Sequence, residues 1–115
     1  MTDHTEIVIQ TMVLPKGAAV DDDEAMRYFG LTVEWRGART ETGRGGYGVK
    51  HSSKWLSRAG NWGYPDKFQQ RQYRWATLEE ALAMAHAHVD AVTLNGLTFI
   101  QFQQFEAQAA ATDKE

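Results

Sequence analysis

The chain has 115 residues, of which 43% are hydrophobic and 23% are charged, and its formal net charge at pH 7 is −3. This composition is typical of a soluble globular protein. The length predicts a single domain over residues 1–115, with a core from about residue 5 to about residue 106 and frayed termini. The absence of cysteine excludes disulfide bonds, thiolate zinc sites and cysteine nucleophiles. The acidic N-terminus and the lack of an apolar run of transmembrane length predict a cytoplasmic protein with no membrane contact.

Strands and one helical turn are predicted for the first third of the chain. Residues 6–14 are β-branched and apolar and end at a Pro-Lys-Gly turn, which is typical of a strand. The acidic run at residues 21–24 leads into a helical turn over residues 25–28, because carboxylates are favourable at the positive end of a helix dipole. Contiguous carboxylates point in different directions, so we interpret this run as a helix start and not as a metal site. In Leu31–Trp35, apolar and polar residues alternate, which predicts a second strand.

The middle of the chain predicts two more strands separated by loops. Residues 36–46 are rich in glycine and are interpreted as a long hairpin loop. Residues 47–55 and residues 70–75 have strand character. Residues 57–64, which lie between them, have the composition of a turn with two aromatic rings embedded in it.

Two patterns suggest enzymatic chemistry, and we favour a different interpretation of each. Residues 43–48 match G-x-G-x-x-G, yet a strand-like segment follows where the dinucleotide fingerprint needs a helix. We interpret them as a hairpin loop, with contact to a polyanion through Arg39 and Arg44 as the alternative. His51 lies beside two serines, but no acid is placed to orient it. We therefore predict no catalytic residue, no cofactor and no metal, and thus a protein that is not an enzyme.

The last third of the chain predicts a helix and a hairpin. Thr77 and Glu80 form a capping box. The apolar residues that follow fall within an arc of roughly 100°, the width of a core-facing stripe: Leu78, Ala81, Leu82, Ala85, Val89 and Val92. Asn95-Gly96 predicts a tight hairpin turn, and the segment beyond Gln108 is expected to fray.

Together these elements predict an α+β fold. We expect a small antiparallel sheet, made of three central strands plus a C-terminal hairpin, with one main helix packed on one face.

Aromatic and basic residues are concentrated in the middle of the chain. All four tryptophans and nine of the twelve basic residues fall between Trp35 and Trp75, where only two acidic residues oppose them. We expect Trp35, Trp55 and Trp75 to fill the core between sheet and helix, because they lie at strand positions. Trp62 and Tyr64 lie in a loop, where they either pack the loop down or anchor a partner.

Two sets of residues in this segment are candidates for binding. A host protein with an acidic surface would suit the rings and neighbouring cations of the loop: Trp62, Tyr64, Lys54, Arg58 and Arg71. DNA or RNA would suit the cations of the predicted strands and hairpin loop: Arg36, Arg39, Arg44, Lys50 and Arg74.

Three segments, residues 54–65, 74–82 and 92–98, resemble a set of small uncharacterised proteins of actinobacteria and their phages. In that set a strand ending in Leu-Ser-Arg precedes a Gly-x-Trp-x-Tyr loop, and a strand, an alanine-rich helix and an Asn-Gly hairpin follow. The likeness covers about residues 32–98, although this chain has Asn61, Gly63 and Lys67 where acidic residues are usual. The resemblance implies an accessory protein of a phage or mobile element and supplies no activity.

These observations lead to three hypotheses. The first is a small, non-enzymatic, phage-type accessory protein of the host cytoplasm that modulates or inhibits a host protein through its basic, aromatic face. The second is direct DNA or RNA binding by the same face. The third is a small virion-associated structural protein. The sequence patterns leave the partner's identity and the oligomeric state open.

Overall fold

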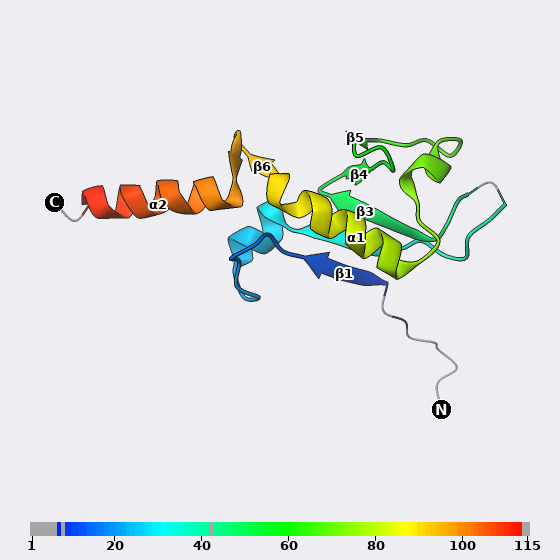
Figure 1. The fold of residues 1–115 in the computed structure, drawn as a ribbon, viewed down its shortest axis with the longest axis horizontal. Coiled ribbons are helices and arrows are strands. Elements are labelled where there is room, and N and C mark those ends of the chain that lie inside the picture. The colour runs from blue at the N-terminus through cyan, green and yellow to red at the C-terminus, as the bar shows by residue number, and fades with distance from the viewer. Residues whose placement is uncertain (1–6, 8, 42, 114–115) are drawn as a thin grey trace, which may run out of the picture.

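The protein is described by a computed structural model that covers residues 7, 9–41 and 43–113. It has two layers, an antiparallel sheet and the helix α1 (Leu78–His88), which lies across one face of the sheet on β2 and β3 (Figure 1). A small hairpin after α1 leads into α2 (Phe99–Asp113), which extends away from these layers.

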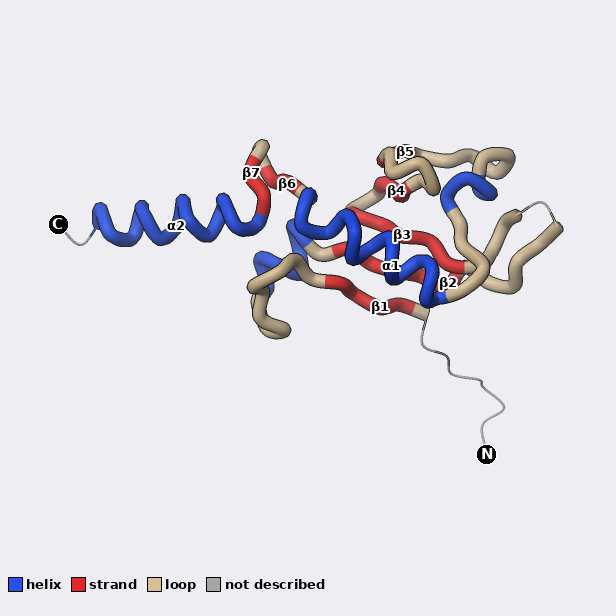
Figure 2. The backbone as a smooth tube through the Cα atoms, viewed as in Figure 1, coloured by secondary structure: helices blue, strands red, loops and turns tan. Residues whose placement is uncertain are grey.

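The main sheet is a five-stranded meander in which consecutive strands are antiparallel neighbours (Figure 2). Its strands are β1 (Gln10–Val13), β2 (Leu31–Trp35), β3 (Tyr47–His51), β4 (Lys54–Leu56) and β5 (Trp62–Gly63). The α+β class is therefore confirmed. The main sheet has five strands, and the C-terminal hairpin, which was expected to join the three central strands, forms a separate two-stranded sheet. Residues 6 and 8 of the predicted first strand lie outside the described residues.

The prediction of one strand over residues 47–55 is wrong, because the chain reverses direction at Ser52 and Ser53. Ser52 has a φ of 57°, and the residues on either side of this two-residue turn, His51 and Lys54, are paired. The segment therefore forms β3 and β4. Because of the turn, each residue of β4 lies on the opposite face of the sheet from the one that it would occupy in a continuous strand.

The prediction of a strand over residues 70–75 is also wrong. Gln70–Tyr73 forms a 3₁₀ helix, η2, and only Trp75 pairs with the sheet. The backbone N–H groups of Trp75 and Tyr47 each donate to the other residue's carbonyl oxygen at 2.8 Å. The short strand β5 lies in the segment that was expected to be a turn.

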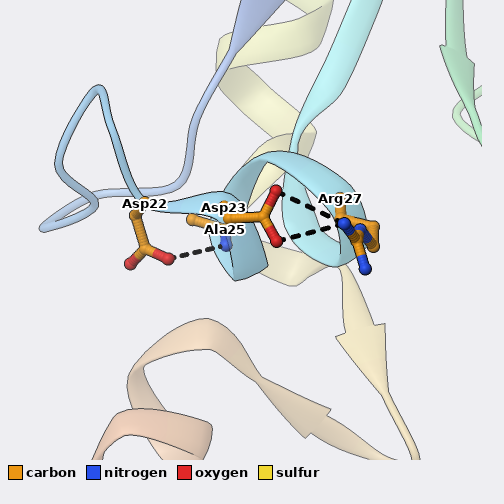
Figure 3. A network of polar contacts seen from close by, with 4 residues as sticks. All are labelled: Asp22, Asp23, Ala25 and Arg27. Atoms are coloured by element: carbon orange, nitrogen blue, oxygen red, sulfur yellow. Dashed lines mark hydrogen bonds and ion pairs between the residues drawn. The ribbon is translucent and has the colours of Figure 1, made fainter.

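The acidic run begins a helical turn, as predicted. The turn, η1 (Ala25–Phe29), is a π-helical segment that ends at Gly30. The Ala25 N–H donates to Asp22 Oδ1 at 3.0 Å, and Arg27 Nη2 lies 3.2 Å from Asp23 Oδ2 (Figure 3). The carboxylates are thus bound to the turn that they precede.

The predicted main helix and its Thr77 cap are confirmed, but Leu78 of the predicted core-facing stripe is 38% exposed and Val92 lies beyond the helix. The Thr77 hydroxyl accepts from the Glu80 N–H at 3.2 Å and donates to Glu80 Oε1 at 2.9 Å. Ala81 and Ala85 are fully buried against the sheet, and their small side chains let the helix approach it closely. The α-helix ends at His88 and continues as a short 3₁₀ segment, η3 (Val89–Ala91). The apolar residues buried in the core are Val13, Ala25, Phe29, Leu31, Val33, Val49, Leu56, Trp75, Ala81, Ala85, Val89, Val92 and Phe99.

The predicted Asn-Gly hairpin joins β6 (Thr93–Leu94) to β7 (Leu97–Thr98), and both turn residues have positive φ. The helix α2 begins at Phe99, which packs its ring against Phe29 at 5.4 Å, and continues to Asp113, beyond the point where fraying was expected. The radius of gyration, 17.1 Å, exceeds the roughly 13 Å of a compact domain of this length, because α2 projects outward. None of the described helices is long and apolar enough to cross a membrane.

We predict that Thr77→Ala lowers the free energy of unfolding by about 1 kcal/mol, because the Glu80 N–H loses its acceptor at the start of α1. Thr77→Ser retains the hydroxyl and is the matched control. Urea denaturation followed by circular dichroism measures both variants. An equal loss in the two variants would contradict a capping role for the hydroxyl.

Candidate anion-binding site

The face of the main sheet that α1 does not cover carries polar and basic residues. Consecutive residues of a strand point to opposite faces. Val33 and Val49 are paired neighbours buried in the core, so the residues that follow them, Glu34 and Lys50, point to the opposite face. We call this opposite face the open face. Its members include Thr32, Glu34, Gly48, Lys50 and Trp55.

The expectation that Trp55 fills the core is wrong. Trp55 pairs with Lys50 across β3 and β4, so its half-buried ring lies on the open face. Trp75 is confirmed as a core residue, with 6% of its surface exposed. Trp35 lies at the end of β2 and keeps 36% of its surface exposed, so it is not a core residue either.

Three cations surround the Trp55 ring. Its centroid lies 4.4 Å from Arg74 Cζ, 5.4 Å from Lys50 Nζ and 5.5 Å from Arg36 Cζ. A cation within about 6 Å of an indole ring is attracted by the ring's quadrupole. The ring therefore holds three positive charges together on the open face, although they repel one another.

Gly48 provides the space for this arrangement. A Cβ atom at position 48 would lie 2.7 Å from Trp55 Cζ3 and 2.9 Å from Arg74 Nη1. Carbon atoms are in favourable contact at about 3.5–4.0 Å, so a side chain here would displace the indole or the guanidinium. The glycine lets both groups rest directly on β3.

Arg74 is buried without an ion pair. Only 4% of its surface is exposed, and none of the described carboxylates forms an ion pair with it. Its Nη1 donates to the Tyr73 carbonyl at 2.9 Å, whereas its buried Nε has no acceptor within the described part of the chain. Burial, and then the charge of Arg36, lower the pKa of Arg74 to about 10, so the side chain is still positive at pH 7.

These residues line a hollow of about 340 Å³ on the open face, which we call the Trp55 hollow. Its walls come from the β2–β3 loop, β4 and the segment around η2. The lining residues are Arg36, Arg44, Gly45, Trp55, Lys67, Gln70 and Arg74. Glu34, whose Oε2 lies 3.4 Å from Arg36 Nη1, is the acidic side chain that partly offsets these cations. The arrangement is suited to binding an anion.

The structure brings most of the nucleic-acid set together at this hollow. Arg36, Arg44 and Arg74 line it, and Lys50 contacts the same indole ring. Arg39 does not line the hollow; it lies in the β2–β3 loop, where a Cβ atom on Gly46 would be 3.4 Å from its Nη1. The glycine motif of this loop leads directly into β3, as a hairpin loop should.

Three residues of the protein-binding set line a different hollow. Lys54, Trp62 and Tyr64 line this hollow together with His51 and with residues that follow α1, and its volume is about 440 Å³. We call it the Trp62 hollow. It lies on the helix side of the sheet, because Lys54 pairs with His51 and Trp62 pairs with the core residue Leu56.

The remaining two residues of that set lie elsewhere. Arg58 Nε donates to the Arg74 carbonyl at 2.8 Å, so this side chain supports the backbone beside the Trp55 hollow. The Arg71 stem packs against the β2–β3 loop, where a Cβ atom on Gly43 would lie 2.6 Å from its Cγ.

His51 is bound to the backbone of η1. Its Nε2 lies 2.8 Å from the Tyr28 carbonyl oxygen. Because a carbonyl oxygen only accepts hydrogen bonds, this nitrogen must carry the proton. The contact engages one of the two ring nitrogens that a serine–histidine site would need.

Neither candidate set included Lys67 and Gln70, which line the Trp55 hollow. Gln70 was predicted to begin a strand and begins η2 instead, whereas Lys67 lies just before η2, in residues 65–69, for which no element was predicted. The positive charge of Lys67 was the available signal, but Lys67 is distant in sequence from Arg36, so the sequence did not show that both line one hollow.

Negative charge gathers at the other end of the molecule. A shallow groove at the base of α2 is lined by Asp21, Asp22, Asp23, Glu24, Phe99, Phe102, Gln103 and Glu106. The Glu106 carboxylate is the main cause of a raised pKa of Glu24. Although the net charge of the whole chain is only −3, the molecule has an acidic end and a basic open face.

No family model matches the chain, and neither a curated protein nor a solved structure matches it significantly.

We predict that Gly48→Ala lowers the free energy of unfolding by about 1–3 kcal/mol, because the added methyl group overlaps the Trp55 ring. The same substitution in a Trp55→Ala background should cost less, because the overlapping ring is gone. Denaturant titration of the four proteins of this double-mutant cycle measures the difference. Equal costs in both backgrounds would show that Gly48 does not act through the indole.

Proposed function

We propose that the protein is a non-enzymatic nucleic-acid-binding protein that contacts the phosphate backbone of DNA or RNA with its open face. The observation that carries this proposal is the gathering of Arg36, Arg44, Lys50, Lys67 and Arg74 around Trp55. Proteins bind nucleic-acid backbones chiefly through such cations, with release of the counterions that surround the phosphates.

The surroundings of Trp55 favour backbone contacts over base stacking. An indole that binds single strands offers an open ring face to a base. Here three cations lie within about 5.5 Å of the ring centroid and occupy its surroundings. Contacts to phosphates carry no direct sequence information, so the proposal is of binding to many sequences with similar affinity.

The separation of charge supports the same proposal. The acidic groove at the base of α2 would repel a polyanion, whereas the open face would attract it. Such a distribution orients the protein during diffusional encounter. The resemblance to proteins of actinobacteria and their phages adds the proposal of an accessory role in the cytoplasm of a phage host.

We predict that generic DNA or RNA binds with a log–log salt slope of about −3 to −4.5, if about three to five cations meet phosphates. Arg44→Gln with Lys50→Gln should weaken binding to every sequence and reduce the magnitude of the slope by about 2. Fluorescence anisotropy of labelled single-stranded and double-stranded oligonucleotides at several salt concentrations measures both quantities.

The matched control for this experiment is Lys16→Gln with Arg27→Gln, which removes the same charge outside the open face. Arg27 lies in η1 and is bound to Asp23. Lack of binding at low salt, or equal weakening by the two double variants, would contradict the proposal.

A second candidate function is the binding of a host protein at the Trp62 hollow, by which the protein would modulate or inhibit that host protein. The observation that favours it is the meeting of Trp62, Tyr64 and Lys54 around one concave surface. Tyr64 is 66% exposed beside this hollow, and exposed tyrosines are frequent anchors of protein interfaces. Trp62 packs partly against the core and would contribute to stability as well.

For this second candidate, we predict that Tyr64→Ala abolishes capture of a specific host protein while leaving the thermal midpoint nearly unchanged. Phe68→Ala is the control, because Phe68 is an aromatic residue that is 85% exposed and does not line the hollow. Affinity capture from host lysate with mass spectrometry compares the variants. Capture of the same protein by all variants would exclude Tyr64 as the anchor.

A further inference from the structure

We propose that the Trp55 hollow is a binding site for a single phosphate group, with Arg74 as its anchor. The inference rests on the proposed function, because it assigns one phosphate of the bound nucleic acid to a fixed position on the open face. It goes further, because a phosphate site that is already formed in the free protein should also bind inorganic phosphate in the absence of a nucleic acid.

The first argument is the state of Arg74. A buried polar group without a hydrogen-bond partner is rare in folded proteins and is costly. Arg74 combines such a group, the Nε–H, with a positive charge that no described carboxylate pairs, and it lines the hollow although it is almost wholly buried. A small rotation of the guanidinium toward an arriving anion would give the Nε–H an acceptor.

The second argument is that neighbouring groups position Arg74 at the hollow, so that only a small rotation of its guanidinium over the Trp55 ring is needed. Its guanidinium rests on the Trp55 ring, Gly48 leaves the space beneath both groups, and its carbonyl accepts a hydrogen bond from Arg58 Nε. Preorganisation of this kind reduces the entropy lost when a ligand binds. A cation with only a general electrostatic role would not need this support.

The third argument concerns the ligand. The planar guanidinium fork matches the spacing of two phosphate oxygens, and charge-assisted bonds of this type are strong. Arg44 and Lys67 line the same hollow and can approach further oxygens from the β2–β3 loop and from the segment before η2. Four cations line the hollow. Cations on several sides favour a phosphate, which offers oxygens in several directions, over a carboxylate, whose two oxygens are coplanar.

The test is a titration of the whole protein with inorganic phosphate at constant ionic strength, followed by ¹H–¹⁵N NMR of the arginine Nε–H and tryptophan indole signals. We expect the Arg74 and Trp55 signals to shift in a saturable manner with phosphate, and not with chloride or acetate. Arg74→Lys keeps the charge but loses the fork, and we expect it to weaken phosphate binding by about tenfold or more.

Arg74 packs against Trp55, so its replacement could also disturb the fold. Arg44→Gln and Lys67→Gln alter exposed side chains and should each weaken phosphate binding by about two- to fivefold. Arg27→Gln, at η1, should leave it unchanged. An unchanged affinity in both hollow variants would overturn the inference.

The other outcomes separate the inference from the proposed function. If nucleic acid binds but phosphate shifts no Arg74 signal, the phosphate site is wrong and the backbone-binding function stands. If phosphate binds but nucleic acid does not, the hollow is a site for small anions and the proposed function is wrong. Equal shifts of the NMR signals with phosphate, acetate and chloride would show that the ions only screen charge. That result would overturn the proposal of a phosphate site.

Discussion

The arrangement of the open face depends on the absence of a side chain at position 48. Trp55 and Arg74 come from segments that are distant in sequence, and both lie over the same point of β3. With any larger residue there, the indole would have to turn away and the guanidinium would lose its support. The cluster of Arg36, Lys50 and Arg74 forms around a ring whose position depends on the space that this glycine leaves.

The burial of Arg74 gives no evident advantage to folding. Withdrawing a guanidinium from water is unfavourable, and the lowered pKa of Arg74 reflects that cost and the nearby charge of Arg36. The contact with Trp55 offsets part of the cost, but the Nε–H is left without an acceptor. An apolar residue of similar size could pack over Gly48 without these penalties. The presence of an arginine at position 74 is explained if its side chain binds an anionic ligand.

The sequence predicted the fold class, the helix α1 with its cap, the strand β2 and the Asn-Gly hairpin, because each depends on residues that are close in the chain. It did not predict the reversal at Ser52, since serine is not a typical residue for the positive φ that Ser52 adopts. That reversal changes the face on which Trp55 lies, so one unrecognised turn made a surface residue look like a core residue. The Trp55 hollow was missed for a different reason, because segments that are distant in sequence form its walls.

The alternation of faces along β3 separates two surfaces that the sequence could not distinguish. Lys50 and His51 are adjacent in β3, yet Lys50 contacts the Trp55 ring on the open face and His51 lines the Trp62 hollow on the helix side. The residues of the basic, aromatic segment therefore contribute to two surfaces, one on each face of the main sheet. A ligand on one side does not block the other, so substitutions on the two sides can be interpreted independently, provided that the sheet between them keeps its pairing.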